Sequence, residues 1–166
     1  MSALHSRVLR STLVAGAALV LAGLAVPANA APERGDDFGP IPFAAGEGCE
    51  FPFAVSGTGG LVNTHTNGEV ITTTGRGSAL TFTNPATGAV FATPSTGSNQ
   101  RVTPLPDGTD LVVSTGNFVI ILFSTDPGGP STTLHHGRVV YIDDNGEFTI
   151  LSSAGSETDV CAALSS

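Results

Sequence analysis

Three histidines and two aspartates are the residues of this 166-residue chain best suited to proton-transfer chemistry. A pair formed by His65 and either His135 or His136, with a carboxylate such as Asp110 or Asp143, is the best general acid–base arrangement that the sequence offers. His135 and His136 are adjacent, so on a strand their side chains face opposite sides. The simpler interpretation treats all three as polar loop histidines, and no catalytic residue is assigned.

Metal and cofactor motifs are missing from the sequence. A zinc site needs at least three protein ligands, and the histidines have no free cysteine to join them. The acidic turn at residues 143–147 resembles a calcium loop, but Tyr141 stands where that loop needs an oxygen ligand. Phosphate-binding, dinucleotide-binding and nucleophile-elbow motifs are absent, and all six basic residues are arginines, which excludes Schiff-base chemistry. The sequence predicts no metal ion and no cofactor.

The two cysteines, Cys49 and Cys161, are predicted to form one disulfide. Such a bridge would enclose almost the whole domain. The chain-entropy treatment gives about 4 to 5 kcal/mol as an upper figure for a loop of this length.

Residues 1–30 have the three parts of a secretory signal. Arg7 and Arg10 form a basic start, residues 13–26 are apolar, and Ala28-Asn29-Ala30 is a small-residue cleavage box. The alternative, a membrane anchor, would need about twenty apolar residues. We therefore expect cleavage after Ala30, secretion, and no membrane span in the mature chain.

The charge balance excludes two classes of partner. The net charge is −8, and it becomes −10 when Arg7 and Arg10 leave with the signal, since four arginines then face 14 acidic residues. Phosphate neutralisation requires a basic surface, and anionic lipids repel an acidic protein. Nucleic-acid binding and electrostatic membrane binding are not expected.

The mature chain divides into a leader and one domain. Residues 31–48 are rich in Pro, Gly and acid, which predicts a flexible leader. Residues 49–166 contain short runs of Val, Ile, Thr and Phe at roughly ten-residue spacing, which is typical of an all-β domain. Asn67-Gly68, Asp107-Gly108 and Asn145-Gly146 favour hairpin turns. One short helix is expected near residues 157–164.

One run, Phe118-Val-Ile-Ile-Leu-Phe123, is apolar on both faces, so both faces of that strand must be covered. The simpler interpretation is a central strand covered by the leader or by the C-terminal turn. The alternative is that one face, formed by Phe118, Ile120 and Leu122, lines a ligand cavity or contacts a partner.

Several of these segments together resemble a known group of proteins. They are the strand after Cys49, the Asn-Gly and Asp-Gly hairpins, Gly137-Arg-Val-Val140, and the ending Thr158-Asp-Val-Cys-Ala-Ala-Leu164. Residues 49–164 are similar to the small exported all-β proteins of high-GC Gram-positive bacteria. These proteins are largely of unassigned function, so the resemblance implies a fold type and export but no catalytic residue.

We expect an antiparallel up-and-down meander of eight to ten strands, closed by the terminal disulfide. A barrel is favoured over a β-sandwich, because the disulfide would bring the first and last segments together. The favoured function is a secreted binding module for an apolar small molecule or a protein. The alternatives are a structural extracellular protein without a ligand, and a small isomerase or cyclase. An interior cavity larger than about 300 Å³ would favour binding.

Overall fold

Strands account for most of residues 32–166, the part of the chain that the computed structural model describes. The predicted signal segment lies outside these residues. The eleven strands are β1 (Glu33–Arg34), β2 (Phe38–Phe43), β3 (Phe53–Thr58), β4 (Leu61–Asn67), β5 (Val70–Arg76), β6 (Ala79–Thr83), β7 (Val90–Thr93), β8 (Gly97–Pro104), β9 (Asp110–Leu122), β10 (Ser131–Asp144) and β11 (Glu147–Asp159). The one helix within these described residues, α1 (Val160–Leu164), begins after Asp159, whose carboxylate accepts a hydrogen bond from the amide of Ala162.

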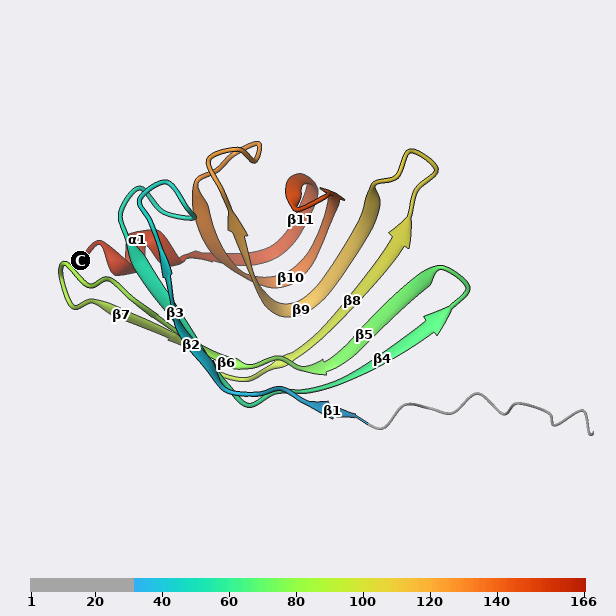
Figure 1. Cartoon of the computed structure of the whole chain (residues 1–166), viewed down its shortest axis with the longest axis horizontal. Coiled ribbons are helices and arrows are strands. Elements are labelled where there is room, and N and C mark those ends of the chain that lie inside the picture. Colours follow the sequence, from blue (N-terminus) through green and yellow to red (C-terminus); the bar gives the residue numbers. More distant parts are fainter. Residues whose placement is uncertain (1–31) are drawn as a thin grey trace, which may run out of the picture.

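The strands form two antiparallel sheets. Sheet A has seven strands in the order β1-β4-β5-β8-β9-β10-β11, and sheet B has four in the order β2-β3-β6-β7. Neither sheet closes on itself, so the structure confirms the all-β antiparallel class but not a closed barrel. The edges are left open because the short β1 and the C-terminal β11 lie at opposite sides of sheet A (Figure 1).

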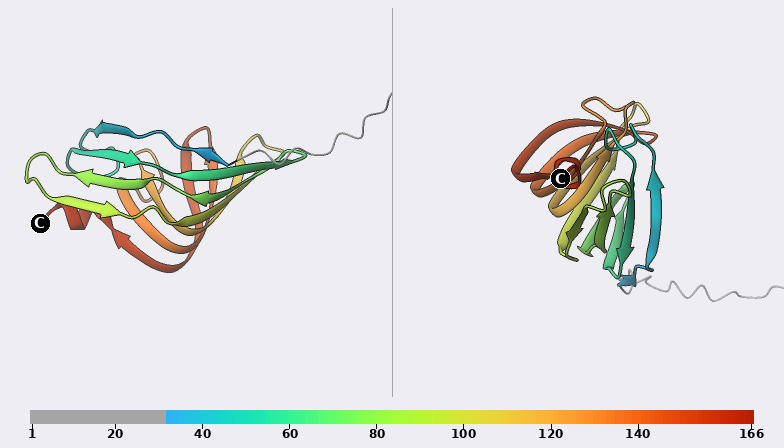
Figure 2. Two further views of the ribbon diagram at one scale, coloured as in Figure 1. Left: turned by 90° about the horizontal axis from the view of Figure 1, so that it is seen from below. Right: turned by 90° about the vertical axis from the view of Figure 1, so that its left-hand side faces the viewer.

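Sheet B continues the first strands of sheet A beyond a short break. Thr58 pairs with Ala79 on one side of the break, and Leu61 pairs with Arg76 on the other. Two residues of each strand, 59–60 and 77–78, therefore lie in the break, and the pairing register is the same on both sides of it. The same strands run on from one sheet into the other in Figure 2. Counted as continuous strands, neighbours follow chain order, as the hairpin turns predicted.

A row of glycines marks where the last three strands bend. Gly116 of β9 pairs with Gly137 of β10, and Gly137 pairs with Gly155 of β11. Gly116 has a φ of 99° and Gly155 a φ of 119°, both in the left-handed region that favours glycine. A Cβ at either position would overlap a carbonyl oxygen of the neighbouring strand. The glycines therefore permit a sharp bend across the sheet.

The sheets diverge next to this glycine row. Ser98 and Gly116 form the last pair between β8 and β9 in that direction. Beyond this pair, β7 belongs to sheet B and β9 stays in sheet A, and Figure 1 shows the two strands diverging. We call the space between them the fork, and the two diverging sheets its arms. Half of the molecule is thus two-layered, which is the part of the β-sandwich expectation that the fold supports.

Two hydrophobic clusters fill the faces of β9 and β10. The first lies between sheet B and β10 and includes Phe53, Phe82 and Leu134, with Val160 and Leu164 of α1. The second covers the opposite face of sheet A, and its buried members are Val112, Ile120, Leu122, Val139 and Tyr141. One face of the run at residues 118–123 is thus covered, since Ile120 and Leu122 are buried, whereas on the other face Ile121 is half-buried and Phe123 is 37% exposed.

The disulfide joins Cys49 to Cys161, as the sequence predicted, and their Cα atoms are 5.6 Å apart. It holds α1 against the first cluster. The buried Asn84 ties down the end of the same helix, because its amide donates a hydrogen bond to the carbonyl of Leu164 at 3.1 Å.

The structure corrects the flexible leader. Residues 31–48 contain β1 and β2, and β2 pairs with β3, so that Ile41 lies opposite Val55 and Phe43 opposite Phe53. Phe43 also stacks on Phe53 with ring centroids 4.8 Å apart. Pairing with β3 and the stacking of Phe43, the one half-buried residue of β2, order the segment. The ordered fold thus starts before Cys49, and residues 32–166 contain eleven strands rather than eight to ten.

Candidate functional site

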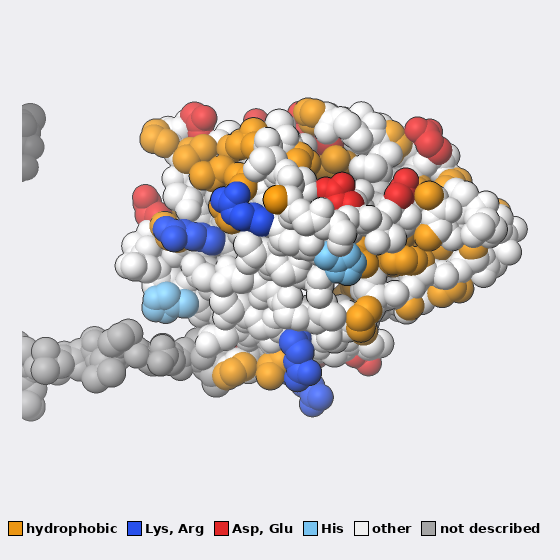
Figure 3. All heavy atoms as spheres, turned by 180° about the vertical axis from the view of Figure 1, so that it is seen from behind, with side chains coloured by type: hydrophobic (Ala, Val, Ile, Leu, Met, Phe, Trp, Pro, Cys, Tyr) orange, Lys and Arg blue, Asp and Glu red, His pale blue; other side chains and the backbone are white. Residues whose placement is uncertain are grey.

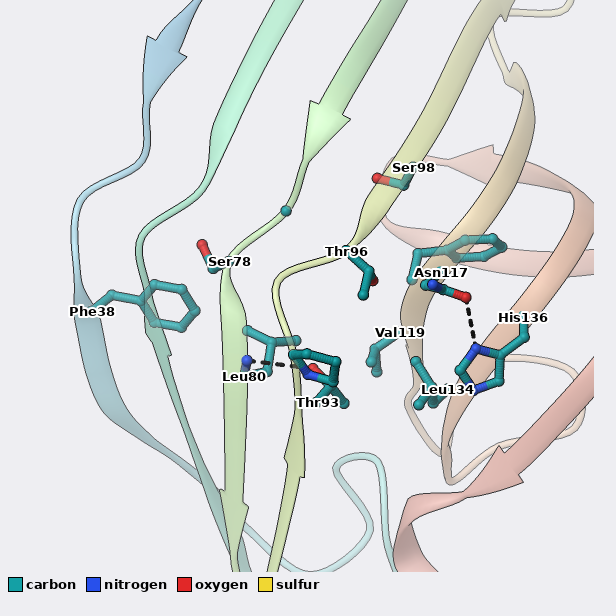
Figure 4. A pocket seen from close by; sticks show the side chains of 13 residues that line it. Phe38, Ser78, Leu80, Thr93, Thr96, Ser98, Asn117, Val119, Leu134 and His136 are labelled. Atoms are coloured by element: carbon teal, nitrogen blue, oxygen red, sulfur yellow. Dashed lines mark hydrogen bonds between the residues drawn. The ribbon is translucent and has the colours of Figure 1, made fainter.

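A groove of about 330 Å³ lies in the fork between the two sheets. Its apolar wall comes from both sheets and comprises Phe38, Leu80, Pro94, Phe118, Val119 and Leu134. The polar residues around it are Ser78, Thr93, Thr96, Ser98, Asn117 and His136. Figure 4 shows these side chains converging on the space between the arms of the fork.

A second hollow of about 210 Å³ adjoins the groove. The two share Phe38, Leu80 and Val119. The remaining walls of the second hollow are apolar and comprise Ile41, Phe43, Val55, Phe82 and Ile121. The groove and the second hollow therefore lie next to each other between the sheets, with three apolar lining residues in common.

Part of the opening of this groove is apolar as well. Phe38 and Ile41 on β2 are 39% and 47% exposed. On the face drawn in Figure 3, hydrophobic side chains line the end formed by sheet B, and the arginines lie elsewhere. An apolar molecule would therefore meet apolar side chains on the β2 side of the opening, and the exposed His136 on the β10 side.

Asn117 and His136 are the polar residues of the groove whose side chains bind each other. They lie opposite one another in the β9–β10 register, and His136 Nδ1 is 2.6 Å from Asn117 Oδ1. Two other polar side chains are committed to the backbone. Ser78 donates to the carbonyl of Gly59 at 2.9 Å, and Thr93 accepts from the amide of Leu80 at 3.4 Å.

The structure separates His135 from His136. His135 lies on the opposite face of sheet A, is 7% exposed, and stacks on Phe118 with ring centroids 5.4 Å apart. Its Nδ1 is 3.2 Å from a carboxylate oxygen of Glu157 but has no partner with hydrogen-bond geometry among residues 32–166. Burial lowers the pKa of His135, and the nearby Glu157 charge only partly opposes this effect.

The candidate acid–base residues do not come together. His65 is exposed on β4, which is separated from β9 by β5 and β8. Asp110 and Asp143 pair with each other at the far end of β9 and β10. Gly137 lies between this end of β10 and the histidines at 135 and 136. Asp143 instead accepts a hydrogen bond from the amide of Gly146 in the hairpin turn, at 2.8 Å.

The face proposed for a ligand, Phe118, Ile120 and Leu122, divides between two environments. Ile120 and Leu122 are buried in the second cluster at 6% and 8% exposure. Phe118 lines the groove, although Val119, the other apolar residue of β9 that lines it, lies on the opposite face of the strand. Sequence reasoning missed Asn117, because its place opposite His136 depends on the strand register. It also missed Phe38, because the segment was interpreted as a leader.

The opposite face of sheet A carries a small polar group around Tyr141. The amide of Gln100 donates to the Tyr141 hydroxyl at 3.2 Å and to Ser114 at 3.4 Å. Burial raises the pKa of Tyr141. Each partner is satisfied within the sheet, so this group contributes to packing.

Across residues 32–166, no three His, Cys, Asp or Glu side chains are placed to hold a metal ion together. No helix in the same residues is long and apolar enough to cross a membrane. No protein-family model, curated protein or solved structure matches this chain. Its function must be argued from the groove itself.

Proposed function

We propose that the chain is a secreted binding protein that holds an apolar small molecule in the groove between its sheets. The observation that carries this proposal is the groove of about 330 Å³, whose wall comes from both arms of the fork. Ligand pockets are typically of about 300 to 1,000 Å³ and mostly apolar, with a few placed polar groups. The adjoining hollow extends the same apolar wall.

The groove favours a small molecule over an extended peptide. A peptide would add to a sheet edge through backbone hydrogen bonds. On β2, one edge strand of sheet B, Pro40 and Pro42 have no N–H to donate. The other strand edges beside the groove, β7 and the part of β9 beyond Gly116, are open, so the preference for a small molecule rests on the volume and the apolar wall of the groove.

The two other function classes have less support. A structural protein without a ligand would have its inter-sheet space filled with side chains, whereas about 330 Å³ is open. An isomerase or cyclase would need a titratable pair facing its substrate. The partner of His136 is Asn117, and the residues that line the groove within the described chain include no Asp or Glu.

Secretion is part of the same proposal. The disulfide fits an oxidising compartment, and residues 1–30 have the pattern of a cleavable signal. We expect the intact mass of protein from culture medium to correspond to a chain that starts at Ala31. A membrane-retained chain that still carries Met1 would contradict secretion.

Binding of a neutral apolar dye tests the groove. We expect Nile red to bind the purified protein with a rise in fluorescence, and Leu80→Trp to reduce that rise by occupying the space shared by the two hollows. Val90→Trp, on an exposed position of β7 outside the groove, is the matched control. Circular dichroism checks that each variant is folded.

A second variant removes the risk that Leu80→Trp fails to fold. Phe38 is 39% exposed at the groove mouth, so Phe38→Ala should keep the fold while weakening dye binding. The proposal is wrong if wild-type protein binds no dye, or if folded Leu80→Trp and Phe38→Ala bind it as wild type does.

A further inference from the structure

Asn117 and His136 leave one donor and one acceptor unused at the groove. The oxygen of the Asn117 amide can only accept, so the ring nitrogen Nδ1 of His136, 2.6 Å away, carries the hydrogen. In the neutral ring this leaves Nε2 as an acceptor. Within residues 32–166, neither His136 Nε2 nor the Asn117 amide nitrogen has a hydrogen-bond partner, and Figure 4 shows the Asn117 nitrogen turned toward Thr96 and the groove.

A neighbouring donor and acceptor select the chemistry of a ligand group. A hydroxyl satisfies both, because its oxygen accepts from Asn117 while its hydrogen is donated to His136. A carboxylate only accepts and would face the lone pair of the neutral ring. An ammonium only donates and would face the amide hydrogens of Asn117.

The groove also lacks a counter-charge. The residues that line it within the described chain include no Lys, Arg, Asp or Glu. His136 is exposed and Asn117 half-buried, so a charged group held there would keep part of its hydration, but it would find no ionic partner among the lining residues to replace the rest. An uncharged polar group loses far less.

We infer that the ligand is an uncharged apolar molecule with one hydroxyl group, and that Asn117 and His136 hold this hydroxyl. This inference rests on the proposed function. The apolar part of the ligand packs on Leu80, Val119 and Leu134 and extends toward the second hollow. The groove has the space of roughly ten water molecules, at about 30 Å³ each, and an alkyl chain would displace them from an apolar wall.

Displacement of bound Nile red at pH 7.5 by three eight-carbon probes tests the inference. We expect octan-1-ol to displace the dye at a concentration at least tenfold lower than octanoate or octylammonium does. Asn117→Leu should raise the octan-1-ol concentration needed by about fivefold, the effect of one neutral hydrogen bond, after each variant's own affinity for the dye has been measured and taken into account. Asn63→Leu, the same substitution on an exposed position of β4 outside the groove, is the control and should change neither.

The outcomes separate the two proposals. If wild-type protein binds no dye, the proposed function fails. If dye binds but octanoate or octylammonium displaces it as well as octan-1-ol does, or if Asn117→Leu leaves octan-1-ol unaffected, the hydroxyl inference is overturned while apolar binding stands.

Discussion

Shortening Ile120 and Ile121 separately to alanine tests whether the two faces of β9 are packed differently. Ile120 is 6% exposed in the second hydrophobic cluster. Removing a buried isoleucine side chain to alanine costs about 2 to 5 kcal/mol, because a cavity adds to the lost transfer free energy. We expect a loss of about 3 kcal/mol in the free energy of unfolding for Ile120→Ala.

Ile121 borders the second hollow, so its side chain already has open space on one side. Ile121→Ala removes three carbons, and about 0.8 kcal/mol for each fully buried carbon sets the upper limit of the lost free energy of unfolding. Because part of this surface is not in contact with protein atoms, we expect a loss of about 1 kcal/mol for Ile121→Ala.

Urea denaturation measures both free energies. The chain has one tyrosine and no tryptophan, so the fluorescence of the buried Tyr141 reports unfolding, and far-ultraviolet circular dichroism provides a second probe. The corresponding melting midpoints should fall by roughly 3 to 4 °C per kcal/mol for a domain of this size. Equal losses at the two positions would show that the sheets close on each other in solution, and would refute the open groove.

Three further predictions concern the disulfide, His135 and the glycine row. Cys161→Ser should lower the free energy of unfolding by up to about 4 to 5 kcal/mol, since the bridge closes a loop with a sequence separation of 112; non-reducing denaturation of both proteins measures it, and an unchanged midpoint would contradict the expectation. Because the pKa of His135 is lowered by folding, its contribution to stability is present above about pH 6.5 and is lost as the pH falls through the folded value. Urea titrations between pH 7.5 and 5 should show this loss in wild type and in His65→Gln but not in His135→Gln. Gly116→Ala should destabilise the protein by more than Gly108→Ala, which also has a positive φ but open space around it; equal midpoints in urea would show that the close approach of the strands costs nothing.

Local signals in the sequence were sufficient for part of the fold. Phe53 and Val55 alternate with less buried residues and face the core. Asn145 and Gly146 both have positive φ and form the two-residue turn between β10 and β11. The cysteine pair needed only the count and the setting of an exported chain. Each of these inferences depends on neighbouring residues or on a single pairing.

The β2 strand could not be predicted from local composition. Pro40 and Pro42 lower strand propensity, but an edge strand pairs on one side only and tolerates a missing N–H. What orders the segment is the contact between Phe43 and Phe53, two residues on different strands. Tertiary packing therefore makes a strand of a segment whose own sequence favours coil.

The groove could not be predicted from the sequence, because it forms where the two sheets diverge. Its polar pair depends on the β9–β10 register, and its position depends on the place where β8 and β9 stop pairing, at Ser98 and Gly116. One signal was present in the sequence. Gly116, Gly137 and Gly155 each interrupt a run of strand-forming residues, and glycine inside a strand marks a bend or a close backbone approach.

The unbroken register across the two sheets links their unfolding. Because the pairing of Thr58 with Ala79 continues as the pairing of Leu61 with Arg76, a one-residue slip in sheet B would force the same slip in sheet A and turn every side chain of both hairpin halves to the wrong face. The sheets should therefore open as one cooperative unit. Amide hydrogen exchange at the paired positions of β3 and β4 would then report a single opening free energy on both sides of the break, rather than one value for each sheet.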